Sequence, residues 1–473
     1  MKRAWLIARA ELRLFSRDRV ALTVSAVAGL ILTVATVVAA DRAQQVREAR
    51  THYQSLVNRQ FEAQPNRHPH RVVHYGTFAF RQPGLLAGFD PGIESFVGHM
   101  VYLEGHRQNT ANFGEARKSS MLLRFGELSP AFVLQVLWPL LLVFLGFGAM
   151  ARERERGYLV PLLAQGVSIR SLIAGKWLAL SIIALLLAAP ALVLLWIIGS
   201  TVDLMTVTAL SFSAYVIYLL TWAGAIVLVS ALSRSARNAL FGCLAAWTAT
   251  VIVIPRALTE VASLVVMLPT RVETDIRIHH ELAAMGDSHN PDDPYFKTFR
   301  AKVLAQYGVS RIEELPVNYA GVLGVEGERM TSRLFDEHSV GTFALLEKQN
   351  RLVETFGVLS PVVSLRCLSM TAAGSGWSAY RDFLEQAERY RFELVQALNT
   401  LQAVKLSYAD DIDESKENRI DAAYLRALQE FHWISPDPGR VAASLITPLF
   451  TLLAWAVAIL GALLIASRRM GVR

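Results

Sequence analysis

The sequence predicts an all-α membrane protein with six transmembrane helices and a mostly helical extracytoplasmic domain. Three observations lead to this fold class. Of the 473 residues, 53% are hydrophobic and only 18% are charged, whereas soluble globular proteins average about 25% charged residues. The apolar residues gather in six long runs, and most Lys and Arg residues near these runs fall on one side of the membrane. This composition excludes a disordered chain and a small domain held together by disulfides.

Six apolar runs are long enough to cross a bilayer. An α-helix rises about 1.5 Å per residue, so about 20 apolar residues span a hydrocarbon core of about 30 Å. An unpaired backbone group is costly in lipid, and these runs must therefore be helical. The predicted spans are residues 20–40, 130–150, 177–199, 209–232, 239–267 and 441–466. We expect the first span to remain uncleaved, because its apolar run is longer than that of a usual signal peptide.

Two of these spans carry local signals. The second opens with Ser129 and Pro130, which suit the N-cap and the first position of a helix. The fifth contains Pro255, followed by Arg256 and Glu260, whose spacing places them on one helix face. A charge at mid-bilayer costs roughly 2.5–3.5 kcal/mol, so two interpretations stay open. Either Arg256 and Glu260 line a polar path or gate, or the helix leaves the membrane near Pro255.

The distribution of cations gives the orientation. The short connection between spans three and four contains Asp203 and no cation. Cations occur instead at both ends of the chain, between spans two and three, and between spans four and five: Lys2, Arg3, Arg9, Arg13, Arg17, Arg19, Arg152, Arg154, Arg156, Arg170, Lys176, Arg234, Arg237, Arg468, Arg469 and Arg473. By the positive-inside rule, both termini are cytoplasmic in a multi-pass protein of the cell inner membrane. Residues 41–129 and 268–440 are then extracytoplasmic segments, and 467–473 form a cytoplasmic tail.

Residues 1–19 predict an amphipathic helix on the cytoplasmic side. Its apolar side carries Trp5, Ala8, Leu12 and Phe15, and its basic side carries Arg9, Arg13 and Arg17. A basic face opposite Trp and Phe is typical of a helix that lies in the membrane interface. The alternative is a plain cytoplasmic extension of the first span.

The cytoplasmic loop 151–176 is the most informative segment. Alternating charges over 152–156 lead to Gly157, and an apolar stretch follows over 158–164. Gly166 is placed to end a short helix there, because glycine readily adopts the left-handed conformation of a helix C-terminus. A short apolar helix in the cytoplasm needs a groove to cover it, which a partner protein would provide. The alternative is a plain helix end from which Arg and Glu side chains reach water.

These segments resemble an ABC-2 type transporter permease of the subgroup with a large helical extracytoplasmic domain of unknown function. Residues 10–19 resemble the interfacial, or elbow, helix of that family. The loop resembles its glutamate-rich motif and ATPase-coupling helix at Glu153, Arg154, Glu155, Gly157, Leu162, Leu163 and Gly166. Tyr158 departs from the pattern, since many relatives carry Thr there. The resemblance implies six helices in the arrangement of type V exporters.

The resemblance also implies a function and partners. The chain would be the permease subunit of an ABC transporter, with ATP and Mg bound by separate ABC ATPase subunits and a second permease copy or paralogue beside it. It would export or extract an unidentified substrate. The alternative is a mechanotransmission or scaffold subunit that moves its extracytoplasmic domain against a periplasmic or envelope partner without translocating a substrate.

The chain itself shows no signature of an enzyme. Gly175 and Lys176 lack the upstream glycine of a phosphate-binding loop, and Trp177 follows them instead of Ser or Thr. We therefore expect no ATP hydrolysis and no cofactor in this chain. No basic stripe with interleaved aromatic residues is present, so nucleic acid is not an expected partner.

The outer segments predict helices and no metal site. Apolar residues three and four apart place one stripe on a helix over 377–404: Trp377, Tyr380, Phe383, Ala387, Tyr390, Leu394, Ala397, Leu401 and Val404, with Arg381, Glu385, Glu388 and Arg391 on other faces. All histidines fall in the outer segments, including His68, His70 and His74 and the adjacent His279 and His280. Imidazole is the commonest metal ligand, so a metal contact in the outer segments is the alternative. Because these segments hold most residues outside the membrane, the bias in histidine position does not require a metal site. The acidic run 410–414 lacks the central glycine of a calcium loop and predicts a solvated turn.

Overall fold

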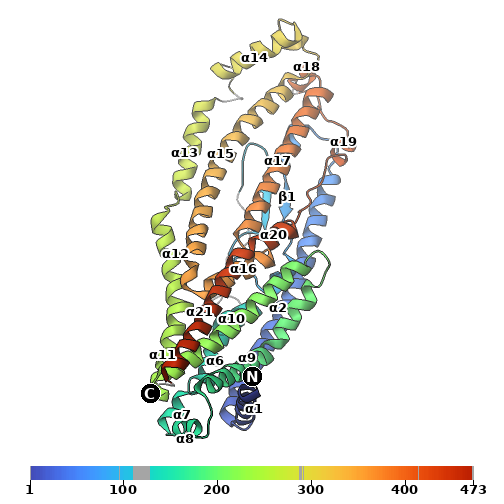
Figure 1. Cartoon of the computed structure of the whole chain (residues 1–473). Helices are drawn as coiled ribbons and strands as arrows, with labels where there is room; N and C mark the ends of the chain where they lie inside the picture. Colours follow the sequence, from blue (N-terminus) through green and yellow to red (C-terminus); the bar gives the residue numbers. More distant parts are fainter. Residues whose placement is uncertain are drawn as a thin grey trace.

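The computed structural model describes residues 2–94, 96–109, 128–286, 290, 292–413 and 415–470. Its helices confirm the predicted all-α membrane fold. Within the described residues, six helical segments are long and apolar enough to cross a membrane: Arg19–Glu62, Pro130–Glu155, Ile169–Gly199, Met205–Leu232, Ala236–Val265 and Pro438–Met470. The molecule is elongated, with these segments in its lower half and the outer segments above them (Figure 1).

The lower half contains an N-terminal helix, the spans, and two short helices between the second and third spans. Its elements are α1 (Lys2–Phe15), α2 (Arg19–Glu62), α5 (Pro130–Phe132), the π-helix η3 (Val133–Leu137), α6 (Trp138–Gly146), α7 (Ala151–Glu155), α8 (Leu159–Ala164), α9 (Ile169–Gly199), α10 (Met205–Leu232), α11 (Ala236–Trp247), the π-helix η4 (Thr248–Val253), α12 (Ile254–Val265), α20 (Pro438–Ser444) and α21 (Ile446–Met470). The predicted N-cap at Ser129 forms, since its hydroxyl accepts a hydrogen bond from the Phe132 N–H.

The first span continues as one helix far beyond residue 40. The 44 residues of α2 correspond to a length of about 66 Å, roughly twice the hydrocarbon core. In its outer part, the buried Arg50 donates to the Arg81 carbonyl at 2.8 Å and pairs with Glu94 at 3.2 Å. The same helix therefore leads from the apolar half into the outer domain.

The outer domain is built mainly from long helices. Its elements are α3 (Pro69–Tyr75), β1 (Thr77–Phe80), η1 (Leu85–Gly88), β2 (Met100–Leu103), α13 (Arg271–Met285), α14 (Pro294–Tyr307), η5 (Ile312–Glu314), α15 (Tyr319–Phe356), η6 (Gly357–Leu359), α16 (Pro361–Ala373), α17 (Trp377–Lys405), α18 (Tyr408–Asp411) and α19 (Ala422–Arg426). Helices α15 and α17 pack along each other (Figure 1). The sequence does not predict the small antiparallel hairpin in which Thr77 faces Leu103 and Phe80 faces Met100.

Helix α16 joins the outer domain to the spans. Its Leu365 and Leu368 belong to the same buried apolar cluster as the cores of α6, α9 and α10. On the same helix, the Ser369 hydroxyl lies 2.8 Å from the Tyr215 hydroxyl of α10, which also accepts a hydrogen bond from Gln135 at 2.8 Å. The outer domain and the spans thus share one packed core with a buried polar contact in it.

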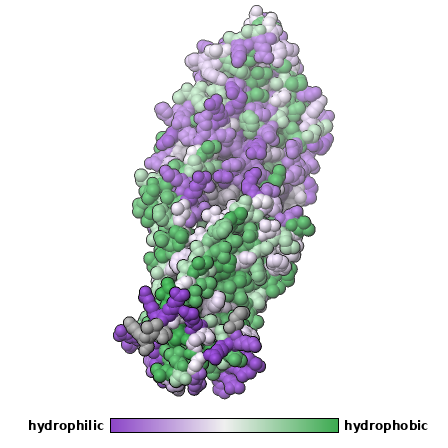
Figure 2. All heavy atoms as spheres, viewed as in Figure 1, coloured by the Kyte–Doolittle hydropathy of each residue, from purple (hydrophilic) through white to green (hydrophobic). Residues whose placement is uncertain are grey.

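The surface separates into bands. A broad apolar region surrounds the spans, with hydrophilic surface above it and hydrophilic patches at the lower end (Figure 2). Both ends of the chain lie at that lower end, together with α7 and α8 (Figure 1). Within the spans, helices α2, α11 and α21 expose large apolar side chains, for example Leu30, Phe241 and Val457. Such a surface suits contact with lipid or with another membrane subunit.

Candidate coupling site

Helix α7 ends at Glu155, two residues before Gly157. Its last turn closes with two backbone hydrogen bonds, from the Gly157 N–H to the Arg154 carbonyl at 3.1 Å and from the Tyr158 N–H to the Glu153 carbonyl at 2.9 Å. This is a Schellman motif, and it requires the left-handed conformation that Gly157 adopts at φ +73°. The turn reverses the chain sharply and leads directly into α8.

Helix α8 ends in the same way at Gly166, which has φ +79°. The Gly166 N–H donates to the Leu163 carbonyl at 2.9 Å, and the Val167 N–H donates to the Leu162 carbonyl at 3.3 Å. The Gly166 carbonyl in turn accepts a hydrogen bond from Arg3 of α1 at 2.7 Å. Two glycines therefore shape the loop, and α1 holds its far end.

Helix α7 is bonded to the connection between α10 and α11. The Arg154 guanidinium donates to the carbonyls of Ala231, at 2.7 Å, and of Ser233, at the C-terminal end of α10. The Glu155 carboxylate accepts a hydrogen bond at 3.0 Å from the Ala236 N–H, at the start of α11. A cation at a helix C-terminus and an anion at an N-terminus each contribute about 0.3–1 kcal/mol of favourable dipole interaction. Arg154 and Glu155 thus bind the adjoining ends of two consecutive spans, α10 and α11.

A buried ammonium group ties α7 to two further helices. The Lys176 Nζ, at the cytoplasm-facing end of α9 in the predicted topology, lies 2.6 Å from Glu153 and 2.7 Å from Glu11 of α1. Next to it, a Cβ on Gly175 would lie 2.7 Å from the Ile7 side chain, so a glycine permits the close approach of α1 to α9. The family resemblance includes Glu153, Gly175 and Lys176, but the sequence does not predict that Glu153 and Glu11 pair with Lys176.

Helix α8 presents an apolar surface to solvent. We call Tyr158, Val160 and Pro161 the α8 surface, because all three residues are exposed, with 72% of Val160 accessible. Leu162 and Leu163, which the sequence singles out, are half-buried instead. Leu163, together with Leu159, packs against the buried core of the spans, and the α8 surface is left uncovered.

Helix α1 forms over the residues predicted for the interfacial helix. Leu12 and Phe15 are half-buried, and α1 packs along α9. Arg9 and Trp5 are exposed, with 52% of Trp5 accessible. Trp5 therefore lies at the outer edge of the apolar side of α1, away from the protein core, and its role at the membrane interface stays a prediction.

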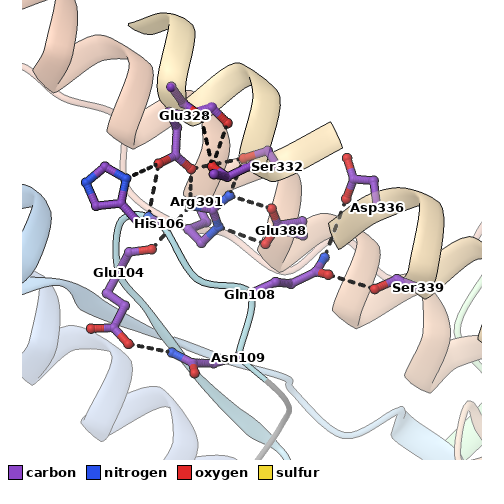
Figure 3. Close-up of polar contacts among 12 residues, drawn as sticks. Glu104, His106, Gln108, Asn109, Glu328, Ser332, Asp336, Ser339, Glu388 and Arg391 are labelled. Carbon is purple, nitrogen blue, oxygen red and sulfur yellow. Dashed lines mark hydrogen bonds and ion pairs between the residues drawn. The ribbon is translucent and has the colours of Figure 1, made fainter. Parts of the chain in front are cut away.

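A second polar group, in the outer domain, was not predicted. We call His106, Glu328, Ser332, Glu388 and Arg391 the outer polar cluster (Figure 3). Arg391 of α17 donates to Glu328 at 2.6 Å, to Glu388 at 2.7 Å and to Ser332 at 2.7 Å. The sequence analysis places Glu388 and Arg391 on faces of this helix other than its apolar stripe. In the structure, α15 and the turn after β2 cover that side of α17 and bury both residues.

The outer polar cluster holds a charged carboxylate out of water. Burial raises the pKa of the Glu328 carboxyl, but the hydrogen bond from His106 and the charge of Arg391 outweigh it and lower that pKa to about 2. For Glu388, burial prevails and raises the pKa of the carboxyl. Arg391 is held by both carboxylates: it donates two hydrogen bonds to Glu388, at 2.8 Å and 2.7 Å, and one to the fully buried Glu328, at 2.6 Å.

The acidic run near residue 411 is also less solvated than predicted. Asp411 accepts hydrogen bonds from Asn318 at 2.7 Å and Gln402 at 2.9 Å and lies 2.6 Å from His68. Burial raises the pKa of Asp411, but the contacts with His68, Gln402 and Asn318 lower it to about 2. Glu414, in the same run, lies outside the described residues.

Comparison with known families decides the class of the protein. The profile described as "ABC-2 family transporter protein" matches residues 5–298, which is more than half of the chain. The chain belongs to the ABC-2 transporter family. A second match, to a domain of unknown function (DUF3526), covers residues 271–434 of the outer domain. A comparison with curated proteins finds no match.

The family assignment confirms the resemblance found in the sequence. The protein is the membrane subunit of an ABC transporter, and membership of the family implies that a separate ABC ATPase works with it. In this ABC-2 permease, Arg256 and Glu260 lie exposed on α12, and no ion pair joins these two described side chains. The helix continues past Pro255 to Val265. A role for Arg256 and Glu260 as a path or gate stays a prediction.

Proposed function

We propose that this ABC-2 permease couples ATP hydrolysis by separate ATPase subunits to the export or extraction of a substrate across the cell inner membrane. The observation that carries the proposal is the contrast between α8 and α7. The α8 surface is apolar and uncovered, whereas α7 is bonded to the ends of several spans. A protein that docks on α8 would therefore act on the spans through α7.

The contacts of α7 support a mechanical connection between α8 and the spans. A displacement of α8 moves Gly157 and the adjoining end of α7, whose Arg154 and Glu155 hold the connection between α10 and α11. The same displacement moves Glu153, and with it Lys176 of α9. Three spans would respond to one push, because charged hydrogen bonds of this kind are stronger and more directional than apolar contacts.

The orientation and the second permease are part of the proposal. The lower end carries both chain ends, α7 and α8 (Figure 1), and the positive-inside rule assigns this end to the cytoplasm, where ATP is available. The exposed apolar faces of α2, α11 and α21 offer room for a second copy or a paralogue. The outer domain would then stand on the far side of the membrane, where it gates the path or meets an envelope partner. No observation on the described residues favours the alternative of a scaffold subunit that transports nothing.

A charge placed on the α8 surface tests the proposal. Val160→Asp puts a carboxylate where an apolar contact is proposed, and Val202→Asp makes the same change at a residue that is 92% exposed in the connection between α9 and α10. The permease is reconstituted in nanodiscs and titrated with its ATPase, and both binding and ATP hydrolysis are measured. We expect binding to weaken at least tenfold in Val160→Asp and to remain unchanged in Val202→Asp. Wild-type affinity in Val160→Asp would contradict the proposal.

A further inference from the structure

Histidines from two separate segments meet on the outer domain. His70 and His74 lie on α3, four residues apart and therefore on one helix face, with their Nε2 atoms 3.2 Å from each other. His106 follows strand β2. One ring nitrogen from each of the three residues lies within 4.8 Å of the other two.

The fold brings His106 to α3 through a close backbone contact. The Gly105 N–H donates to the Val73 carbonyl of α3 at 3.1 Å. A Cβ on Gly105 would lie 2.1 Å from the Val73 side chain, so this approach requires glycine. His106 itself has φ +61°, the one positive φ among the described non-glycine residues. Such a conformation costs roughly 1–2 kcal/mol, and strain of this kind is typical of functional sites.

A buried carboxylate orients the His106 ring. The Glu328 Oε2 accepts a hydrogen bond from the backbone N–H of His106 at 3.0 Å and lies 3.3 Å from the ring nitrogen Nδ1 of the same residue (Figure 3). Arg391 and Ser332 hold the other oxygen of Glu328 at 2.6 Å and 2.9 Å. A neutral imidazole that donates from Nδ1 to a carboxylate carries its lone pair on Nε2. Histidines that bind metal ions almost always have such a carboxylate or carbonyl partner on the second ring nitrogen.

We propose that His70, His74 and His106 bind a divalent transition-metal ion, with Zn²⁺ as the best match. Three imidazoles are a known ligand set for zinc with one further position open to water or another ligand. With Zn–N distances of 2.0–2.1 Å in a tetrahedral site, two ligand nitrogens lie about 3.3 Å apart, close to the 3.2 Å between His70 and His74. His74 is exposed, so the ion and a fourth ligand can enter from solvent.

The proposal replaces the sequence-based expectation of no metal ligands. His68, which stands next to His70 and His74 in the sequence, lies 2.6 Å from Asp411 and does not join the group. His106 takes its place from a distant segment. A bound ion would link α3 to the turn after β2. Through His106 it would also be connected to Glu328 of α15 and, by the ion pair of Glu328, to Arg391 of α17. This inference does not depend on the proposed function.

Direct binding of Zn²⁺ tests the site. The full-length protein is purified without a polyhistidine tag, stripped with a chelator, and dialysed against Zn²⁺, and bound zinc is counted by mass spectrometry. We expect one Zn²⁺ per chain in the wild type and at least tenfold weaker binding in His74→Ala and in His106→Ala. His432→Ala is the matched control, because this histidine is exposed and its side chain lies outside the group.

Thermal unfolding provides the second measurement. Zn²⁺ should raise the unfolding temperature of the wild type and of His432→Ala but not of His106→Ala, since an ion that binds only the folded state stabilises it. Unfolding without metal shows whether each variant is folded. Wild-type protein that binds no zinc saturably, or His74→Ala and His106→Ala variants that bind it as tightly as the wild type, would overturn the proposal.

Discussion

Gly157 offers a clean perturbation of the loop between α7 and α8. It has φ +73°, and no atom lies within 4 Å of the position that a Cβ would occupy. A substitution there changes the backbone energy without causing a clash. Alanine in the left-handed region costs roughly 1–2 kcal/mol, so Gly157→Ala should lower the population of the present loop by a factor of about 5–30. Asparagine tolerates this region better, and Gly157→Asn should have a much smaller effect.

The assay is the affinity of the ATPase for the permease in nanodiscs, together with the rate of ATP hydrolysis. We expect binding to weaken about 5–30-fold in Gly157→Ala and by less than about threefold in Gly157→Asn. Gly29→Ala is the control, because Gly29 lies inside α2, also with no atom within 4 Å of a Cβ, and no positive φ. Unchanged binding in Gly157→Ala, or equal losses in the two Gly157 variants, would refute the reasoning.

Three further predictions concern the buried charges. Glu153→Gln removes one of the two carboxylates at the Lys176 ammonium and should lower the free energy of unfolding by about 1–3 kcal/mol, as measured by thermal unfolding in detergent. Arg391→Met leaves the Glu328 carboxylate buried without its cation and should cost about 3–5 kcal/mol; adding Glu328→Gln should restore part of this loss, and an additive loss would contradict the pairing. The pKa of Asp411 falls from 3.8 to about 2 on folding, so it contributes about 2 kcal/mol that is present above pH 4 and is lost as the pH falls through 2; urea unfolding of Asp411→Asn should lack this dependence on pH.

The sequence predicts the membrane half of the fold well, because the requirement for apolar helices in lipid acts on each span separately. It does not predict where α2 ends. After residue 40 the helix becomes polar, and only its packing in the outer domain, for example through Arg50 and Glu94, shows why it continues to Glu62. The sequence does not predict the hairpin of β1 and β2 either, because its two short strands are stabilised by tertiary contacts with α2 and α17.

The candidate coupling site also combines features that the local sequence predicts with features that depend on tertiary packing. Gly166 is predictable because a left-handed helix end favours glycine at a local position, whereas Gly157 is identified only through the resemblance to the family motif. The pairing of Glu153 with Lys176 and Glu11 is not predictable, since it depends on how α1 and α9 pack.

In the outer domain, one signal was present and was missed. Arg391 lies four residues after Ala387 and three before Leu394, which places it on the apolar stripe of α17 and indicates burial. No local pattern could bring His106 to His70 and His74, because a turn more than thirty residues away along the chain supplies it.

The central claim is that α8 faces the cytoplasm and receives the ATPase. The most direct measurement is labelling of Val160→Cys by a membrane-impermeant thiol reagent, in a background with Cys243→Ala and Cys367→Ala, in inside-out and right-side-out vesicles. We expect labelling only in inside-out vesicles, and protection when the ATPase is bound. Labelling in right-side-out vesicles, or labelling that the bound ATPase leaves unchanged, would contradict the account.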